Sequence, residues 1–71
     1  MSTVMNADFP GKILEVMVKE GDTVTSGQPV LVIEAMKMEN ELLAPAGGTV
    51  AKIHVAANAA VNAGEALLTI E

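Results

Sequence analysis

The chain has 71 residues, which is enough for one small domain over residues 1–71, and its formal net charge is −5. This acidic balance, with aromatic side chains at only 1% of residues, argues against a nucleic-acid partner, which needs basic and stacking groups. The chain has no Cys and a single His, so a disulfide, thiol chemistry and a clustered metal site are not expected.

The N-terminal residues 1–6 have neither the basic region nor the apolar region of a secretory signal peptide. Apolar runs along the chain are much shorter than the roughly 20 residues of a membrane-spanning helix. We therefore expect a cytoplasmic location without direct membrane insertion.

The first half of the chain reads as short strands separated by turns. Apolar runs at 13–18 and 30–33 flank turn residues at 21–22 and 26–27, with a short strand expected around Val24. Within the run 13–18 the apolar positions step by three and then by two, which breaks strict alternation and predicts a β-bulge.

The second half repeats this pattern at a constant offset of 37 positions. Residues that match at this offset include Gly11 with Gly48, Gly27 with Gly64, Leu31 with Leu68, and Ile33 with Ile70. The Ala-rich stretch 55–66 could form a helix on propensity, but it aligns with 18–29, where Gly and Pro would break one. Asn58 aligns with Gly21 and is expected to accept a positive φ there. The repeat predicts an all-β barrel or sandwich with internal two-fold pseudosymmetry.

Between the two halves lies the sequence Glu34-Ala35-Met36-Lys37-Met38-Glu39. Two methionines beside a lone lysine are unusual for a turn, which usually contains Gly, Asn, Asp or Pro. The offset of 37 makes this segment equivalent to the place where the chain termini meet. Lys37 is therefore expected at the end of the domain opposite the termini.

The segment 34–38 resembles the attachment sequence of biotinyl domains, which belong to the wider biotinyl/lipoyl carrier family. The resemblance extends over about residues 7–71, and its other matching segments are 10–13, 18–24, 27–31 and 44–50. It implies a flattened β-barrel of two four-stranded antiparallel sheets, with Lys37 on a tight hairpin. The segment from Gly11 to Gly21 is too short for the "thumb" loop of some bacterial carriers, so the chain is more similar to thumbless carriers.

The resemblance also implies a function. Lys37 would be biotinylated by a biotin protein ligase, a post-translational modification. The covalent biotin would then carry an activated carboxyl group between biotin carboxylase and carboxyltransferase components. In this interpretation the chain is a non-catalytic carrier domain or subunit, monomeric by itself, and no catalytic residue or metal is assigned.

The residues around Lys37 would be read by partner enzymes, and the resemblance assigns this recognition role to Glu34, Ala35, Met36, Met38 and Glu39. Met36 and Met38 have the alternative of packing into the core beside the hairpin. Glu34 and Glu39 have the alternative of forming an ordinary solvated face.

Two other functions remain open for this fold. A lipoyl carrier would hold lipoate on Lys37, although lipoyl domains generally lack the methionine pair. A binding or scaffold module would keep the fold without any modification of Lys37. A stand-alone enzyme is disfavoured because His54, expected as an exposed strand residue, has no Ser, Asp or second His placed to make it a base or ligand.

Overall fold

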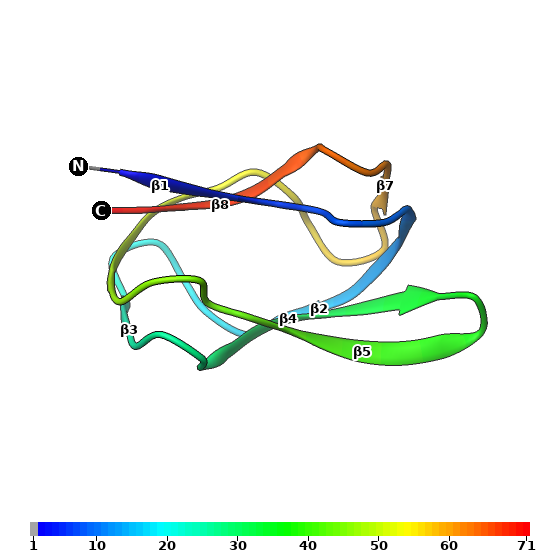
Figure 1. The fold of residues 1–71 in the computed structure, drawn as a ribbon, viewed down its shortest axis with the longest axis horizontal. Coiled ribbons are helices and arrows are strands. Elements are labelled where there is room, and N and C mark those ends of the chain that lie inside the picture. The colour runs from blue at the N-terminus through cyan, green and yellow to red at the C-terminus, as the bar shows by residue number, and fades with distance from the viewer. Residues whose placement is uncertain (1) are drawn as a thin grey trace.

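The computed structural model describes residues 2–71, and these residues form eight β-strands joined by turns (Figure 1). The strands are β1 (Thr3–Asn6), β2 (Gly11–Val16), β3 (Thr23–Val24), β4 (Pro29–Ala35), β5 (Met38–Leu43), β6 (Gly48–Ile53), β7 (Ala60–Val61) and β8 (Ala66–Ile70). The Ala-rich stretch 55–66 contains two turns with β7 between them, as its alignment with 18–29 predicts. Over residues 2–71 no helix is long and apolar enough to cross a membrane.

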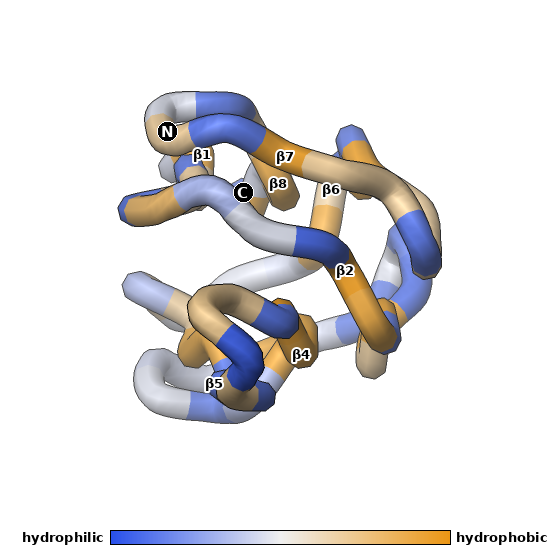
Figure 2. The backbone as a smooth tube through the Cα atoms, turned by 90° about the vertical axis from the view of Figure 1, so that its right-hand side faces the viewer, coloured by the Kyte–Doolittle hydropathy of each residue, from blue (hydrophilic) through white to orange (hydrophobic). Residues whose placement is uncertain are grey.

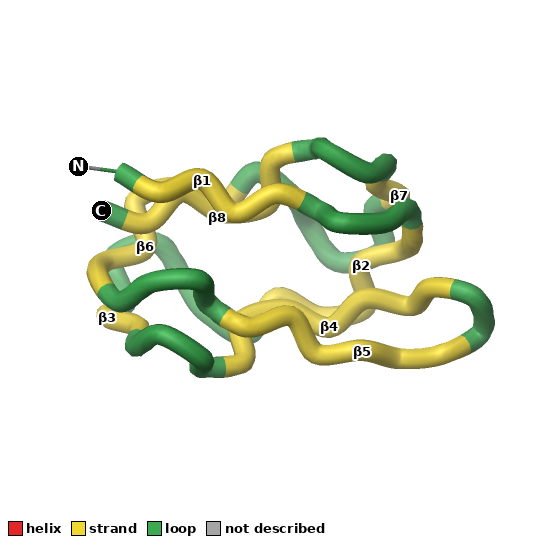
Figure 3. Tube along the Cα trace, viewed as in Figure 1, coloured by secondary structure: helices red, strands yellow, loops and turns green. Residues whose placement is uncertain are grey.

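The strands form two antiparallel four-stranded sheets, in the orders β1-β8-β6-β3 and β5-β4-β2-β7. The offset of 37 positions converts one sheet into the other, because it carries β2 onto β6, β3 onto β7, and β4 onto β8. The predicted pseudosymmetry is therefore confirmed. The hydrogen-bonded ladders of the described residues do not close, so the architecture is a sandwich of two sheets rather than a closed barrel (Figure 3).

The predicted β-bulge is present in β2 and in its counterpart β6. In the pairing of β2 with β4 the register shifts between Ile13 and Glu15. In the pairing of β6 with β8 it shifts between Val50 and Lys52, which are the same positions plus 37. The extra residue at each shift explains why the apolar positions of this run do not alternate strictly.

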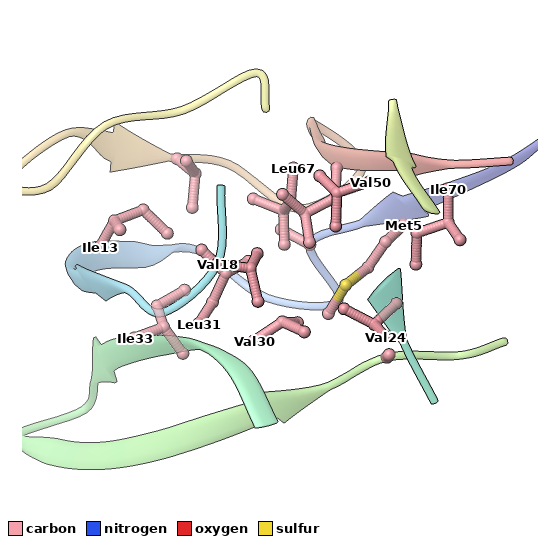
Figure 4. Packing of buried hydrophobic residues seen from close by; sticks show 14 residues of the cluster. Met5, Ile13, Val18, Val24, Val30, Leu31, Ile33, Val50, Leu67 and Ile70 are labelled. Atoms are coloured by element: carbon pink, nitrogen blue, oxygen red, sulfur yellow. The ribbon is translucent and has the colours of Figure 1, made fainter. Parts of the chain in front are cut away.

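The core lies between the two sheets and is built from aliphatic side chains (Figure 4). Its fully buried members are Ile13, Val24, Val30, Leu31, Ile33, Val50, Leu67, Leu68 and Ile70. Viewed from the end that carries the β4–β5 hairpin, the backbone shows hydrophobic segments in both layers with hydrophilic turns around them (Figure 2). Because the chain has no disulfide, this buried aliphatic surface is the main source of stability.

The turns of the two halves adopt the same backbone conformations. Gly21 has a φ of 95°, and its counterpart Asn58 has a φ of 74°, as predicted. The amide of Asn58 donates to the carbonyl oxygen of Ile13 at 2.6 Å, which matches the bond from Gly21 to Val50. The link between β2 and β3 (17–22) has the same length as its counterpart (54–59), in agreement with the absence of a thumb loop.

Strand β1 has no individual prediction from the sequence. Only Met5 of its four residues is buried, so the segment shows no alternation that would indicate a strand. It pairs with β8 at the opposite end of the chain, with Thr3 opposite Ile70. As a result, both ends of the described chain lie at one end of the molecule, and the β4–β5 hairpin lies at the other (Figure 1).

Candidate functional site

The candidate site is the tip of the hairpin between β4 and β5. Ala35 pairs with Met38, so only Met36 and Lys37 remain in the turn. Their φ angles are 52° and 63°. Positive φ at both central residues is the feature of a type I′ turn, whose twist matches that of the strands it joins and which usually contains Asn-Gly.

This turn places ordinary L-residues in a conformation that they avoid. The left-handed region costs a residue with a Cβ atom roughly 1–2 kcal/mol, because the Cβ atom crowds the following carbonyl oxygen. The hairpin tolerates this cost because the remainder of β4 is anchored in the core through Leu31 and Ile33. Backbone strain of this kind, supported by a rigid scaffold, is common at functional sites.

The side chains at the tip project into solvent. Met36 is 95% exposed and Met38 is 64% exposed, so the alternative of core packing is wrong for both. Lys37 is exposed as well, and none of the hydrogen bonds found within residues 2–71 involves its ammonium group. The tip therefore presents one amine and two thioethers that are free to contact another molecule.

Directly behind the tip, charged residues form a row across three strands. Glu34 lies opposite Glu39 on β5 and opposite Lys12 on β2. Residues paired in this way share one face of the sheet, and the three side chains are exposed on its outer face. Two carboxylates placed directly opposite each other repel, and Lys12 on the other side of Glu34 offsets part of this repulsion.

Glu34 and Glu39 are close to Lys37 in the sequence, whereas Lys12 is far from it along the chain. The strand register brings Lys12 into the same row as the two glutamates. Glu41 occupies the next outward position of β5, opposite Val32. Only a known register between β2, β4 and β5 could have revealed this arrangement. Ala35, the smallest residue of the segment, is half-buried at the end of β4.

His54 lies away from the tip. It is exposed, as predicted, but it follows the last residue of β6 rather than lying within a strand, and its Nε2 lies 2.8 Å from the Oγ1 of Thr69. Within residues 2–71 there is no pocket and no group of three or more His, Asp or Glu side chains suited to a metal ion.

Comparison with known proteins identifies the family of the chain. A family model described as "Biotin-requiring enzyme", of the biotin/lipoyl family, matches residues 2–70. The chain is 52% identical over 69 residues to a biotin carboxyl carrier protein of Streptococcus mutans, and the match covers 97% of this chain and 53% of that protein. It is 43% identical over 70 residues to the human mitochondrial propionyl-CoA carboxylase alpha chain, and covers 99% of this chain and 10% of that one.

A similar fold is present in a solved structure. The urea carboxylase of Kluyveromyces lactis contains a region that superposes on the whole of this chain with a TM-score of 0.92 and 30% sequence identity. That region is 6% of the urea carboxylase chain. The chain thus spans about half of one relative and a small part of the larger ones.

Proposed function

The chain belongs to the biotin/lipoyl family of biotin-requiring enzymes, and we propose that it is a biotin carboxyl carrier that holds biotin on Lys37. One observation carries this proposal: Lys37 is an exposed residue of a strained two-residue turn and lies between two exposed methionines. The fit of the group is chemical, since covalent attachment through an amide needs an accessible primary amine. No pocket of the chain's own is needed.

In this proposal Lys37 acts as the nucleophile of the attachment reaction. Its ammonium group loses a proton to the ligase, and the free Nζ lone pair attacks the activated carboxyl carbon of biotin to form an amide. The activating group leaves with the bonding electrons. The contribution of the carrier is position, because the hairpin holds the amine at a fixed place relative to the surface that the ligase contacts.

After attachment, the elongated shape of the domain determines where the biotin is presented. Biotin supplies the ring nitrogen that accepts and releases a carboxyl group. The domain measures 33 × 18 × 17 Å, and its long axis separates the hairpin from the chain termini (Figure 1). A carrier tethered through either terminus therefore presents Lys37 at its free end. This arrangement suits delivery first to a biotin carboxylase and then to a carboxyltransferase.

We assign the recognition of the tip by partner enzymes to Glu34, Ala35, Met36, Met38 and Glu39. Methionine is flexible and polarizable, and so suits a surface that meets several partners in turn. The recognition role of the glutamates can be tested separately from any effect on the stability of the domain. Because Glu34 and Glu39 face each other, Glu39→Gln should leave the melting temperature unchanged or slightly raised. The same change should lower kcat/KM for the ligase, and an unchanged kcat/KM would leave Glu39 as a solvated surface residue.

The proposal is tested by co-expressing the chain with a biotin protein ligase in the presence of biotin. Intact mass and peptide mapping should show one biotinyl group, on Lys37. The Lys37→Arg variant keeps the positive charge but should remain unmodified, because the guanidinium stays protonated and is a poor nucleophile. The control variants Lys12→Arg and Lys52→Arg should be labelled like the wild type.

An unmodified wild-type chain, or biotin on another lysine, would overturn this assignment. In the first case the same experiment with a lipoate ligase would test the lipoyl alternative. A chain that neither ligase modifies would support an unmodified binding module.

A further inference from the structure

The methionines of the described chain differ widely in exposure. Met5 is buried in the core, with 9% of its surface exposed, and its sulfur lies among aliphatic side chains (Figure 4). Met17 is 42% exposed, Met38 is 64% exposed and Met36 is 95% exposed. The two most exposed methionines are therefore the two that flank Lys37.

The composition makes these thioethers the preferred targets of mild oxidants. The chain has no Cys, Trp or Tyr, so no thiol, indole or phenol competes for a two-electron oxidant. Exposure then decides which sulfur reacts first. On this basis Met36 and Met38 should react before Met17, and Met5 should react last.

We propose that Met36 and Met38 are sites of reversible sulfoxidation, and that oxidation of this pair blocks recognition of Lys37 by the biotin protein ligase. The oxidant is a hydroperoxide. The sulfur lone pair attacks one peroxide oxygen, the S–O bond forms as the O–O bond breaks, and the leaving oxygen takes up a proton. With hydrogen peroxide the product is water; the sulfur loses two electrons and the peroxide gains them.

The consequence follows from the change in polarity. A thioether that packs against a partner is apolar, whereas a sulfoxide carries a strong dipole that must be desolvated on contact. This part of the inference rests on the proposed function, since it requires that the ligase contacts the methionines. One desolvated sulfoxide should lower the kcat/KM of the ligase by about tenfold.

The fold itself should not respond to this oxidation. Met36 and Met38 lie outside the buried cluster, and Met36 has almost no surface covered by the rest of the domain. The melting temperature of the tip-oxidised protein should therefore match that of the untreated protein. Met17 serves as the internal comparison for oxidation away from the tip. Its backbone N–H donates to the carbonyl oxygen of Val30, at the end of β4 that is far from the hairpin tip.

The experiment treats the unbiotinylated protein with increasing hydrogen peroxide and maps sulfoxides by peptide mass spectrometry. Each sample is then biotinylated with ligase, ATP and biotin, and the initial rate is measured. We expect oxidation in the order Met36 and Met38, then Met17, then Met5, with a rate loss that follows the first two. Treatment with methionine sulfoxide reductases of both stereospecificities should restore the rate.

The biotinylation rate of a Met17→Leu variant should remain as sensitive to peroxide as that of the wild type.

The outcomes of this experiment distinguish the recognition switch from the proposed function. If the untreated protein is not biotinylated, the proposed function fails. If the untreated protein is biotinylated but the fully tip-oxidised protein reacts at the same rate, the recognition switch is wrong. Oxidation of Met17 or Met5 ahead of the tip, or a rate loss that the reductases do not reverse, would overturn it too.

Discussion

Replacing Met36 with Asn should stabilise the domain and at the same time slow its biotinylation. Met36 has a φ of 52°, where a residue with a long side chain is disfavoured by roughly 1–2 kcal/mol. Asn accepts this region more readily because its short polar side chain can bond to the nearby backbone. Since Met36 is almost fully exposed, its removal costs little packing, and we expect a net gain of about 0.5–1 kcal/mol.

For a domain of this size, each kcal/mol changes the melting temperature by about 4–8 °C. The Met36→Asn variant should therefore melt roughly 2–8 °C higher than the wild type. The chain has no Trp or Tyr, so unfolding is best followed by far-ultraviolet circular dichroism or by calorimetry. The rate of biotinylation by the ligase is measured on the same samples and should fall, because the apolar contact beside Lys37 is lost.

Met38→Asn is the matched control. It makes the same chemical change on the other side of Lys37, but Met38 lies in β5 and pairs with Ala35, outside the left-handed region. Asn is unfavourable in strands, so this variant should melt at or below the wild-type temperature. A Met36→Asn variant that is no more stable than the wild type would refute the strain argument. A stabilised variant with an unchanged biotinylation rate would show that Met36 is not required for recognition.

Three further predictions concern the scaffold behind the tip. A Cβ atom at Gly11 would lie 2.5 Å from the carbonyl oxygen of Glu34, so Gly11→Ala should cost about 1–3 kcal/mol. Gly47→Ala is its control, because the nearest atom would be 3.5 Å away, and urea unfolding should show little change or a small gain. Asn58 has a φ of 74°, so Asn58→Ala should lower the free energy of unfolding by about 1 kcal/mol and the melting temperature by several degrees. Asn58→Gly should have nearly the same melting temperature as the wild type. Leu67 is fully buried, and Leu67→Ala should cost about 2–5 kcal/mol, a large share of the stability of so small a domain, as measured by urea unfolding. The close approach at Gly11 would be contradicted if the Gly11 and Gly47 variants were equally stable. The argument from φ at Asn58 would be contradicted by equal stabilities of the two Asn58 variants, and the argument from burial by a Leu67→Ala variant as stable as the wild type.

The two halves of the fold have equivalent strands and turns, but the strand pairs at their equivalent corners are connected differently. In one sheet, β4 and β5 are joined by the two-residue turn that carries Lys37. At the equivalent corner of the other sheet, β8 and β1 pair without a connecting turn, and both ends of the described residues lie there. The pseudosymmetry thus places Lys37 and the ends of the described residues at opposite poles.

Much of this structure could be predicted from the sequence because it depends on local preferences repeated twice. The spacing of apolar residues in 13–18 predicted the bulge, and the repeat of 37 positions predicted the turn at Asn58 and the location of Lys37. These features follow from backbone conformations that Gly and Asn permit and from the periodicity of apolar residues. The resemblance of the segment 34–38 also predicted that Lys37 lies on a tight hairpin, and the structure confirms this position.

Other features were decided only by tertiary structure. Strand β1 could not be predicted on its own, since it exists through pairing with β8 at the far end of the chain. The exposure of Met36 and Met38 was equally undetermined, because methionine is often buried, and only the pairing of Ala35 with Met38 fixes where the turn falls. The row formed by Lys12, Glu34 and Glu39 depends on the register of three strands. Local sequence sets which conformations a segment prefers, whereas register sets which side chains meet, because a shift of one residue moves every side chain of a strand to the opposite face.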